Sequence, residues 1–77
     1  SMKAKDTAEI RLGALNKVQA EIIDLAALKA ANLAPIFAKQ AKVILSGKLT
    51  QAVKLRGLAA TKGAREAILA AGGTILE

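Results

Sequence analysis

The sequence predicts a small α/β domain in which short strands and short helices alternate along the chain. Two observations support this prediction. Residues 53–56 alternate between apolar and cationic side chains, as a half-buried strand does, and residues 64–71 repeat alanine and isoleucine at helical spacing. Strands interleaved with helices imply crossover connections between the strands. We therefore expect a single domain with a short mixed sheet and two main helices.

The first strand is expected at residues 8–12. Apolar residues alternate there with Glu9 and Arg11, so a short strand with one face in water fits the pattern. After Gly13 the apolar residues follow a helical spacing, which predicts one or two helical turns before the next element.

A helix is expected over residues 24–31. Asp24 suits its N-cap, because a carboxylate accepts a hydrogen bond from a first-turn N–H and lies at the positive end of the helix dipole. Ile23 and Leu28 have the spacing of a hydrophobic staple across that turn. Asn32 tolerates a left-handed backbone and is expected to end the helix.

Residues 33–40 are expected to form a loop. Pro35 disfavours helix at the residue before it and cannot donate a hydrogen bond to a sheet. Ile36 and Phe37 are large and apolar, and we expect both to pack into the core from this loop.

The second half of the chain has the clearest pattern. An apolar run at 43–45 ends at a serine–glycine turn signal, and the alternation at 53–56 predicts a second strand with its two cations in water. Thr61 can cap a helix that ends at the glycine pair 72–73, where a left-handed residue is readily accommodated. Residues 74–76 can add a last short strand.

The composition argues against catalysis. With no histidine and no cysteine, the chain lacks the commonest acid–base residue, the thiol nucleophile and the usual zinc ligands. Its acids are scattered, and no glycine spacing typical of a dinucleotide or phosphate loop occurs. No uncharged run approaches the roughly 18 residues of a membrane span. We expect no enzyme activity, no cofactor or metal, no small-molecule substrate and no membrane partner.

The net charge of +6 is concentrated in the second half. Residues 1–38 carry five cations and four acids (+1), whereas residues 39–77 carry seven cations and two acids (+5). This asymmetry favours a polyanion as the partner, nucleic acid before membrane. A basic surface that only keeps the domain soluble is the alternative explanation.

The strongest candidates for phosphate contact lie between residues 54 and 65. Lys54 and Arg56 share the wet face of one predicted strand. Lys62 and Arg65 lie in the first turn of the following helix, where free N–H groups and the helix dipole favour an anion. Gly63, between them, allows a close approach of the backbone. Weaker candidates, which flank loops, are Lys39, Lys42 and Lys48.

The kind of nucleic-acid contact also follows from the composition. Single-strand readers stack bases on aromatic side chains, and the one aromatic of this chain, Phe37, is expected in the core. We therefore expect phosphate and sugar contacts to a folded RNA surface rather than readout by stacking.

A family resemblance covers nearly the whole chain. The features that carry it are Lys42-Val43-Ile44, Gly47, the Val53/Leu55 alternation, Ala60-Thr61, Ala64, Ile68 and Gly72. Upstream, in the same order, are Ala8-Glu9-Ile10-Arg11-Leu12, Asp24-Leu25 and Leu28-Lys29-Ala30-Ala31-Asn32. Over roughly residues 7 to 77 the chain resembles the family of bacterial large-ribosomal-subunit protein fifteen.

This resemblance implies a fold, a function and a domain organisation. The fold would be irregular strand–strand–helix turns stacked into a compact superhelix. The function would be structural: binding 23S ribosomal RNA beside neighbouring ribosomal proteins in the cytoplasm and supporting subunit assembly. Residues 8–77 would be the C-terminal globular domain, monomeric in isolation, of a protein with a long glycine- and arginine-rich N-terminal extension. Residues 1–7 would be a tag remnant, Ser1-Met2, and a frayed end.

An alternative function comes from another class. The same basic face could dock an acidic protein partner, as a protein-interaction module does. An amphipathic membrane binder fits less well, because the predicted strands interrupt any long interfacial helix.

Overall fold

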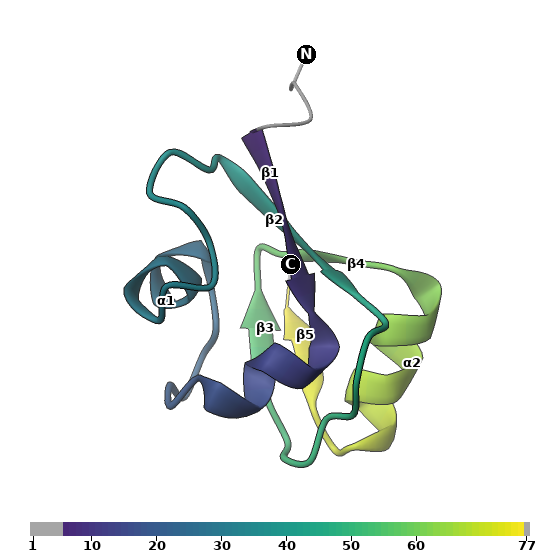
Figure 1. Cartoon of the computed structure of the whole chain (residues 1–77). Coiled ribbons are helices and arrows are strands. Elements are labelled where there is room, and N and C mark those ends of the chain that lie inside the picture. The colour runs from purple at the N-terminus through teal and green to yellow at the C-terminus, as the bar shows by residue number, and fades with distance from the viewer. Residues whose placement is uncertain (1–5, 77) are drawn as a thin grey trace.

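The strands of this protein form two small sheets, in which every strand pair among the described residues is parallel. The computed structural model describes residues 6–76. Its elements are, in order, β1 (Thr7–Arg11), the 3-10 helix η2 (Leu12–Lys17), α1 (Leu25–Ala30), β2 (Gln40–Ile44), β3 (Lys54–Arg56), β4 (Ala59–Ala60), α2 (Lys62–Ala70) and β5 (Thr74–Leu76). The predicted α/β class is confirmed. Figure 1 shows α1 and α2 on opposite sides of the strands.

The predicted mixed sheet is wrong, because both sheets are parallel. One sheet has the order β1-β2-β4 and the other pairs β3 with β5. Parallel neighbours cannot be joined by a tight hairpin. Each pair is therefore joined by a crossover: η2 and α1 lie between β1 and β2, β3 lies between β2 and β4, and β4 and α2 lie between β3 and β5. Side-chain alternation is the same in parallel and antiparallel strands, so it could not predict strand direction.

The first element begins one residue earlier than expected. Thr7, which falls within the stretch predicted to be frayed, is the first residue of β1 and is aligned with Gln40 of β2. The remaining prediction for the start of the chain, a tag remnant followed by a frayed end, lies mostly outside the described residues.

One face of the three-stranded sheet lines the core. The register sets Ile10 beside Val43 and Val43 beside Ala60, so the three apolar residues share the inner face. Full burial of each large apolar side chain contributes about 1.5–3 kcal/mol to the free energy of folding. The largest fully buried side chains are Leu12, Leu15, Ile23, Leu28, Val43, Leu55 and Ile68.

Helix α1 has both of the predicted ends. The Asp24 carboxylate accepts a hydrogen bond from the Ala27 N–H at 2.9 Å. At the other end Asn32 has φ of 61°, and the Leu33 N–H donates to the Leu28 carbonyl at 2.9 Å. This is a Schellman-type end in which asparagine takes the position usual for glycine.

The loop between α1 and β2 corrects one prediction. Ile36 and Phe37 do not enter the core: their exposed fractions are 86% and 65%. The Ala38 N–H donates to the Pro35 carbonyl at 3.0 Å, which closes a turn with Ile36 and Phe37 at its centre. The buried residues of this loop are the small Ala34 and Ala38 that flank the turn. The premise for excluding base stacking, burial of the aromatic, is therefore also wrong.

Helix α2 begins and ends as predicted. The Thr61 hydroxyl accepts a hydrogen bond from the Ala64 N–H at 3.3 Å. At the other end Gly72 has φ of 85°, and the Gly73 N–H donates to the Ile68 carbonyl at 2.8 Å. The short strand β4 before it was not predicted, because its two alanines carry no strand preference.

Candidate nucleic-acid interface

Strand β3 presents two cations from a well-fixed backbone. Lys54 and Arg56 are exposed, while Leu55 between them is fully buried. The strand pairs with β5 on one edge. Ile23 bridges the other edge, since its N–H donates to the Lys54 carbonyl at 2.7 Å and its carbonyl accepts from the Arg56 N–H at 2.9 Å. The predicted wet face with both cations is confirmed.

Arg56 has an anionic neighbour that the sequence did not reveal. Its Nη2 lies 3.6 Å from the Asp24 Oδ2, while the Oδ1 of the same carboxylate caps α1. The hydrogen bond from the Ala27 N–H lowers the pKa of Asp24 below its ordinary value of 3.8, desolvation opposes this shift, and Arg56 lowers the pKa further. Asp24 thus joins the start of α1 to the outer face of β3.

The lowered pKa of Asp24 gives the stability of the domain an acid dependence. The carboxylate stabilises the fold fully above its unfolded pKa, and this stabilisation is lost as the pH falls through the lower, folded pKa. We expect the melting temperature to fall over the acidic pH window in which Asp24 takes up its proton, below its unfolded pKa. Asp24→Asn keeps a good N-cap but cannot titrate, so its melting curve should depend less on pH over that window. If the melting temperatures of the two proteins changed equally with pH, Asp24 would not be the titrating group.

Helix α2 carries the second pair of candidate cations. Lys62 and Arg65 are both exposed in its first turn. The Thr61 hydroxyl accepts a hydrogen bond from the Ala64 N–H. The N–H groups of Lys62 and Gly63 lie in the first turn, where a helix offers no backbone acceptor. Charge and helix dipole at this end therefore both favour an anion.

Gly63 has a packing partner in the fold. A Cβ atom at this position would lie 2.8 Å from the Leu45 Cδ2, so the first turn of α2 rests against that side chain. Close packing of α2 against Leu45 therefore explains why a glycine occupies this position. Its suggested role in letting a ligand approach the backbone stays a prediction.

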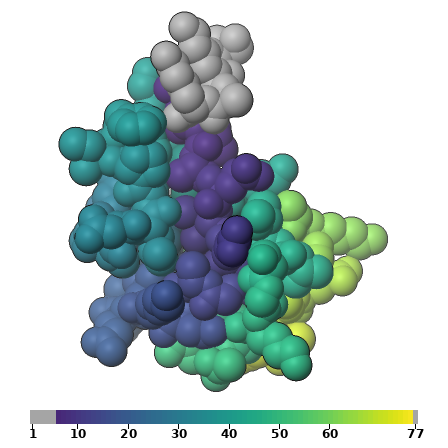
Figure 2. Space-filling view, in the orientation of Figure 1, coloured from purple at the N-terminus to yellow at the C-terminus, as the bar shows by residue number. Residues whose placement is uncertain are grey.

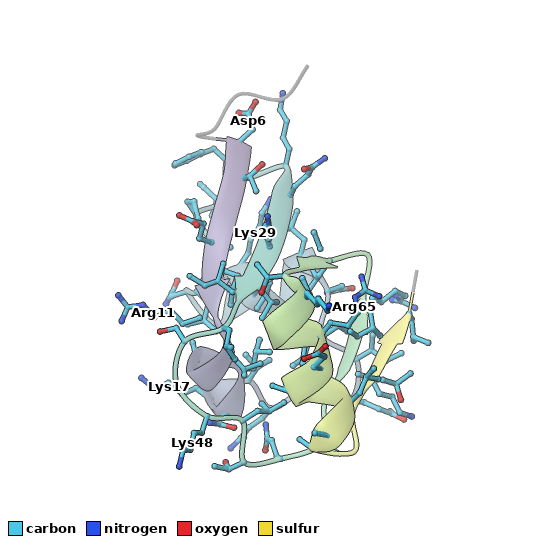
Figure 3. All side chains as sticks on the ribbon, turned by 90° about the vertical axis from the view of Figure 1, so that its right-hand side faces the viewer. Asp6, Arg11, Lys17, Lys29, Lys48 and Arg65 are labelled. Carbon is cyan, nitrogen blue, oxygen red and sulfur yellow. The ribbon has the colours of Figure 1, made fainter. Side chains whose placement is uncertain are left out.

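The remaining candidates lie apart from these two pairs. In Figure 3, Arg65 points to the side of the molecule on which β5 lies, whereas Lys48 points to the opposite side, together with Arg11 and Lys17. Lys42 does not flank a loop, as was expected, but lies within β2 beside Glu9 of β1. The exposed Lys39 immediately precedes β2.

A charge pattern in the sequence could have located more of the interface. From residue 25 to residue 65, between Asp24 and Glu66, the chain holds no acid. The eight cations of this stretch are Lys29, Lys39, Lys42, Lys48, Lys54, Arg56, Lys62 and Arg65. The boundary between the two halves of the chain divides this run. Arg11 and Lys17 precede the run in the sequence, but η2 contacts the segment that holds Lys48.

Residues 6–76 were also compared with the requirements of a metal site and of a membrane-spanning helix. They contain no group of three acidic, histidine or cysteine side chains able to hold a metal ion. None of their helices has both the length and the apolar character needed to cross a bilayer.

A comparison with known protein families gives a match over almost the whole chain. The family model described as "Ribosomal proteins 50S-L15, 50S-L18e, 60S-L27A" matches residues 8–76. The match therefore includes both helices, the strands of both sheets and all four of the cations on β3 and at the start of α2.

Proposed function

The chain belongs to the family of ribosomal proteins 50S-L15, 50S-L18e and 60S-L27A, and on that premise we propose that it binds 23S ribosomal RNA as the bacterial member of the family. A protein of this family is a structural, non-enzymatic component of the large subunit of the cytoplasmic ribosome, in contact with ribosomal RNA and ribosomal proteins. The sequence features that resemble the bacterial protein, among them Lys42-Val43-Ile44 and Gly47, support the finer assignment.

The observation that supports RNA contact most directly is the pair of cationic segments on β3 and α2. We assign phosphate contacts to four exposed side chains on these segments: Lys54, Arg56, Lys62 and Arg65. We call these four residues the β3–α2 surface. The secondary positions for phosphate contact are Gly63, Lys39, Lys42 and Lys48. Cations on a rigid body neutralise phosphates that would otherwise repel one another, so the domain fixes the arrangement of the RNA.

The domain organisation completes the proposal. In this proposal residues 8–77 are the C-terminal globular domain of a protein of this family. Short elements, a buried apolar core and parallel crossovers within 77 residues fit a domain that folds by itself as a monomer.

The salt dependence of RNA binding tests this function. Each phosphate neutralised contributes about 0.7–0.9 to the slope of log affinity against log salt concentration, so contacts by the β3–α2 surface alone should give a slope of about −3. Filter binding of large-subunit RNA fragments between about 50 and 200 mM salt measures it. Affinity that does not change with salt would contradict phosphate contact.

The alternative, an acidic protein partner docked on the same face, is separated by a second experiment. Partners captured from a cell lysate are compared before and after ribonuclease treatment. Release of the captured material by ribonuclease supports the RNA assignment, whereas retention of a defined acidic protein supports the alternative.

A further inference from the structure

We propose that the domain has a second RNA-binding surface, made of Arg11, Lys17 and Lys48, and that it joins two separate RNA segments. The inference rests on the proposed RNA-binding function and extends it from one face of the molecule to two. In Figure 3 the three side chains form a row along one side of the molecule, away from Arg65. We call this row the η2 surface.

The η2 surface is assembled by contacts between distant parts of the chain. Arg11 ends β1 and leads directly into η2, whose last residue is Lys17. The segment after β2 docks on η2 through Asn16, whose Nδ2 donates to the Lys48 carbonyl at 2.8 Å and whose Oδ1 accepts from the Thr50 N–H at 2.8 Å. The Gly13 N–H donates to the Ser46 carbonyl at 2.9 Å. These bonds fix Lys48 beside η2.

The three cations of this surface are not held in ion pairs within the part of the chain that the structure describes. Arg11, Lys17 and Lys48 are all exposed, and none of them forms an ion pair within residues 6–76. In the sheet, Lys42 is aligned with Glu9, whereas Arg11 is aligned with the apolar Ile44. Three exposed cations in a row, free of ion pairs within residues 6–76, suit a run of phosphates, which is the regular charged feature of a nucleic-acid backbone.

In Figure 3 the η2 surface and Arg65 of the β3–α2 surface face opposite sides of the molecule, so one compact RNA hairpin docked on either side would leave the other side free. The molecule measures 32 × 24 × 22 Å, so its opposite sides are separated by more than the screening length of about 8 Å at physiological salt. Figure 2 shows η2 and the segment after β2 on the near face of the molecule. In Figure 1, which has the same orientation, β3 and β5 lie behind this face. A phosphate-binding surface on each side of one rigid body can hold two RNA segments at once.

The test uses a hairpin RNA in two pools, one labelled with a donor dye and the other with an acceptor. Wild-type protein, added below the RNA concentration at about 50 mM salt, should give energy transfer between the pools and a sedimenting complex of one protein with two hairpins. The variant Arg11→Gln/Lys17→Gln/Lys48→Gln should still bind the first hairpin, with affinity reduced less than about 10-fold. Its energy transfer should fall to the level of the free hairpins.

A matched control separates position from total charge. The variant Lys3→Gln/Lys5→Gln/Lys29→Gln also loses three positive charges, none of them assigned to RNA contact, and it should retain most of the energy transfer. Unchanged transfer in the η2 variant, or equal loss in both variants, would overturn the second surface. Wild-type protein that binds one hairpin with the expected salt slope and never two would also overturn it while leaving the proposed function intact. Wild-type protein that binds no RNA would end both.

Discussion

Replacing Lys54, Arg56, Lys62 and Arg65 together with glutamine is expected to weaken binding of large-subunit RNA fragments by at least about 100-fold. Hydrogen bonds to charged groups contribute about 1.5–3 kcal/mol each, and two such contacts already correspond to more than 100-fold in affinity. The salt slope should become shallower by about 3, since four phosphate contacts are lost. Filter binding at several salt concentrations measures both quantities.

The same quadruple variant should keep its fold. All four side chains are exposed, and the Arg56–Asp24 ion pair lies at the surface, where such pairs contribute little to stability. Its melting temperature should therefore stay close to that of the wild type. The Lys3→Gln/Lys5→Gln/Lys29→Gln variant, with nearly the same loss of net charge and no loss of an assigned contact, should bind RNA within about 10-fold of the wild type. Equal losses of affinity in the two variants would show that total charge, rather than the β3–α2 surface, determines binding.

Gly73→Ala is expected to destabilise the domain by about 1–3 kcal/mol, the usual cost of overpacking a tight site. A Cβ atom there would lie 2.6 Å from the Val53 carbonyl oxygen and 2.9 Å from the Ile68 carbonyl oxygen, so backbone would have to move. In a domain of this size the melting temperature should fall by roughly 5–20 °C. Thermal unfolding followed by circular dichroism measures the change.

This position also connects stability to the proposed site. Gly73 lies between the end of α2 and Val53, the residue just before β3, and the Thr74 N–H donates to the Val53 carbonyl at 2.9 Å. Their close approach fixes α2 relative to β3, and with it the two pairs of cations relative to each other. Gly13→Ala is the matched control, because a Cβ atom there meets nothing closer than 3.4 Å and its φ is not positive. A melting temperature as low for Gly13→Ala as for Gly73→Ala would contradict the explanation by backbone clash.

Most elements could be predicted from the sequence because the interactions that begin and end them involve residues close together in the chain. Asp24 and Thr61 cap their helices with their own side chains, and Asn32 and Gly72 adopt the left-handed backbone that ends a helix. The charged alternation around Leu55 reappears as the wet face of β3.

The features that were missed depend on contacts between distant segments. Hydrophobicity suggested that Ile36 and Phe37 are buried, but the turn closed at Pro35 directs both outward. The contact of Arg56 with Asp24 joins residues 32 positions apart, which no spacing rule connects. Lys48 was grouped with the other cations, although Asn16 holds its backbone on the opposite side of the molecule from Arg65.

The central claim is that the domain contacts RNA phosphates through the β3–α2 surface. Its most direct test is a titration of ¹⁵N-labelled protein with the RNA hairpin, followed through the backbone amide resonances. Large shifts are expected at residues 54–56 and 61–65, and these shifts should disappear at high salt. Shifts confined to α1 and the loop at residues 33–39, with the β3 and α2 amides unmoved, would contradict it.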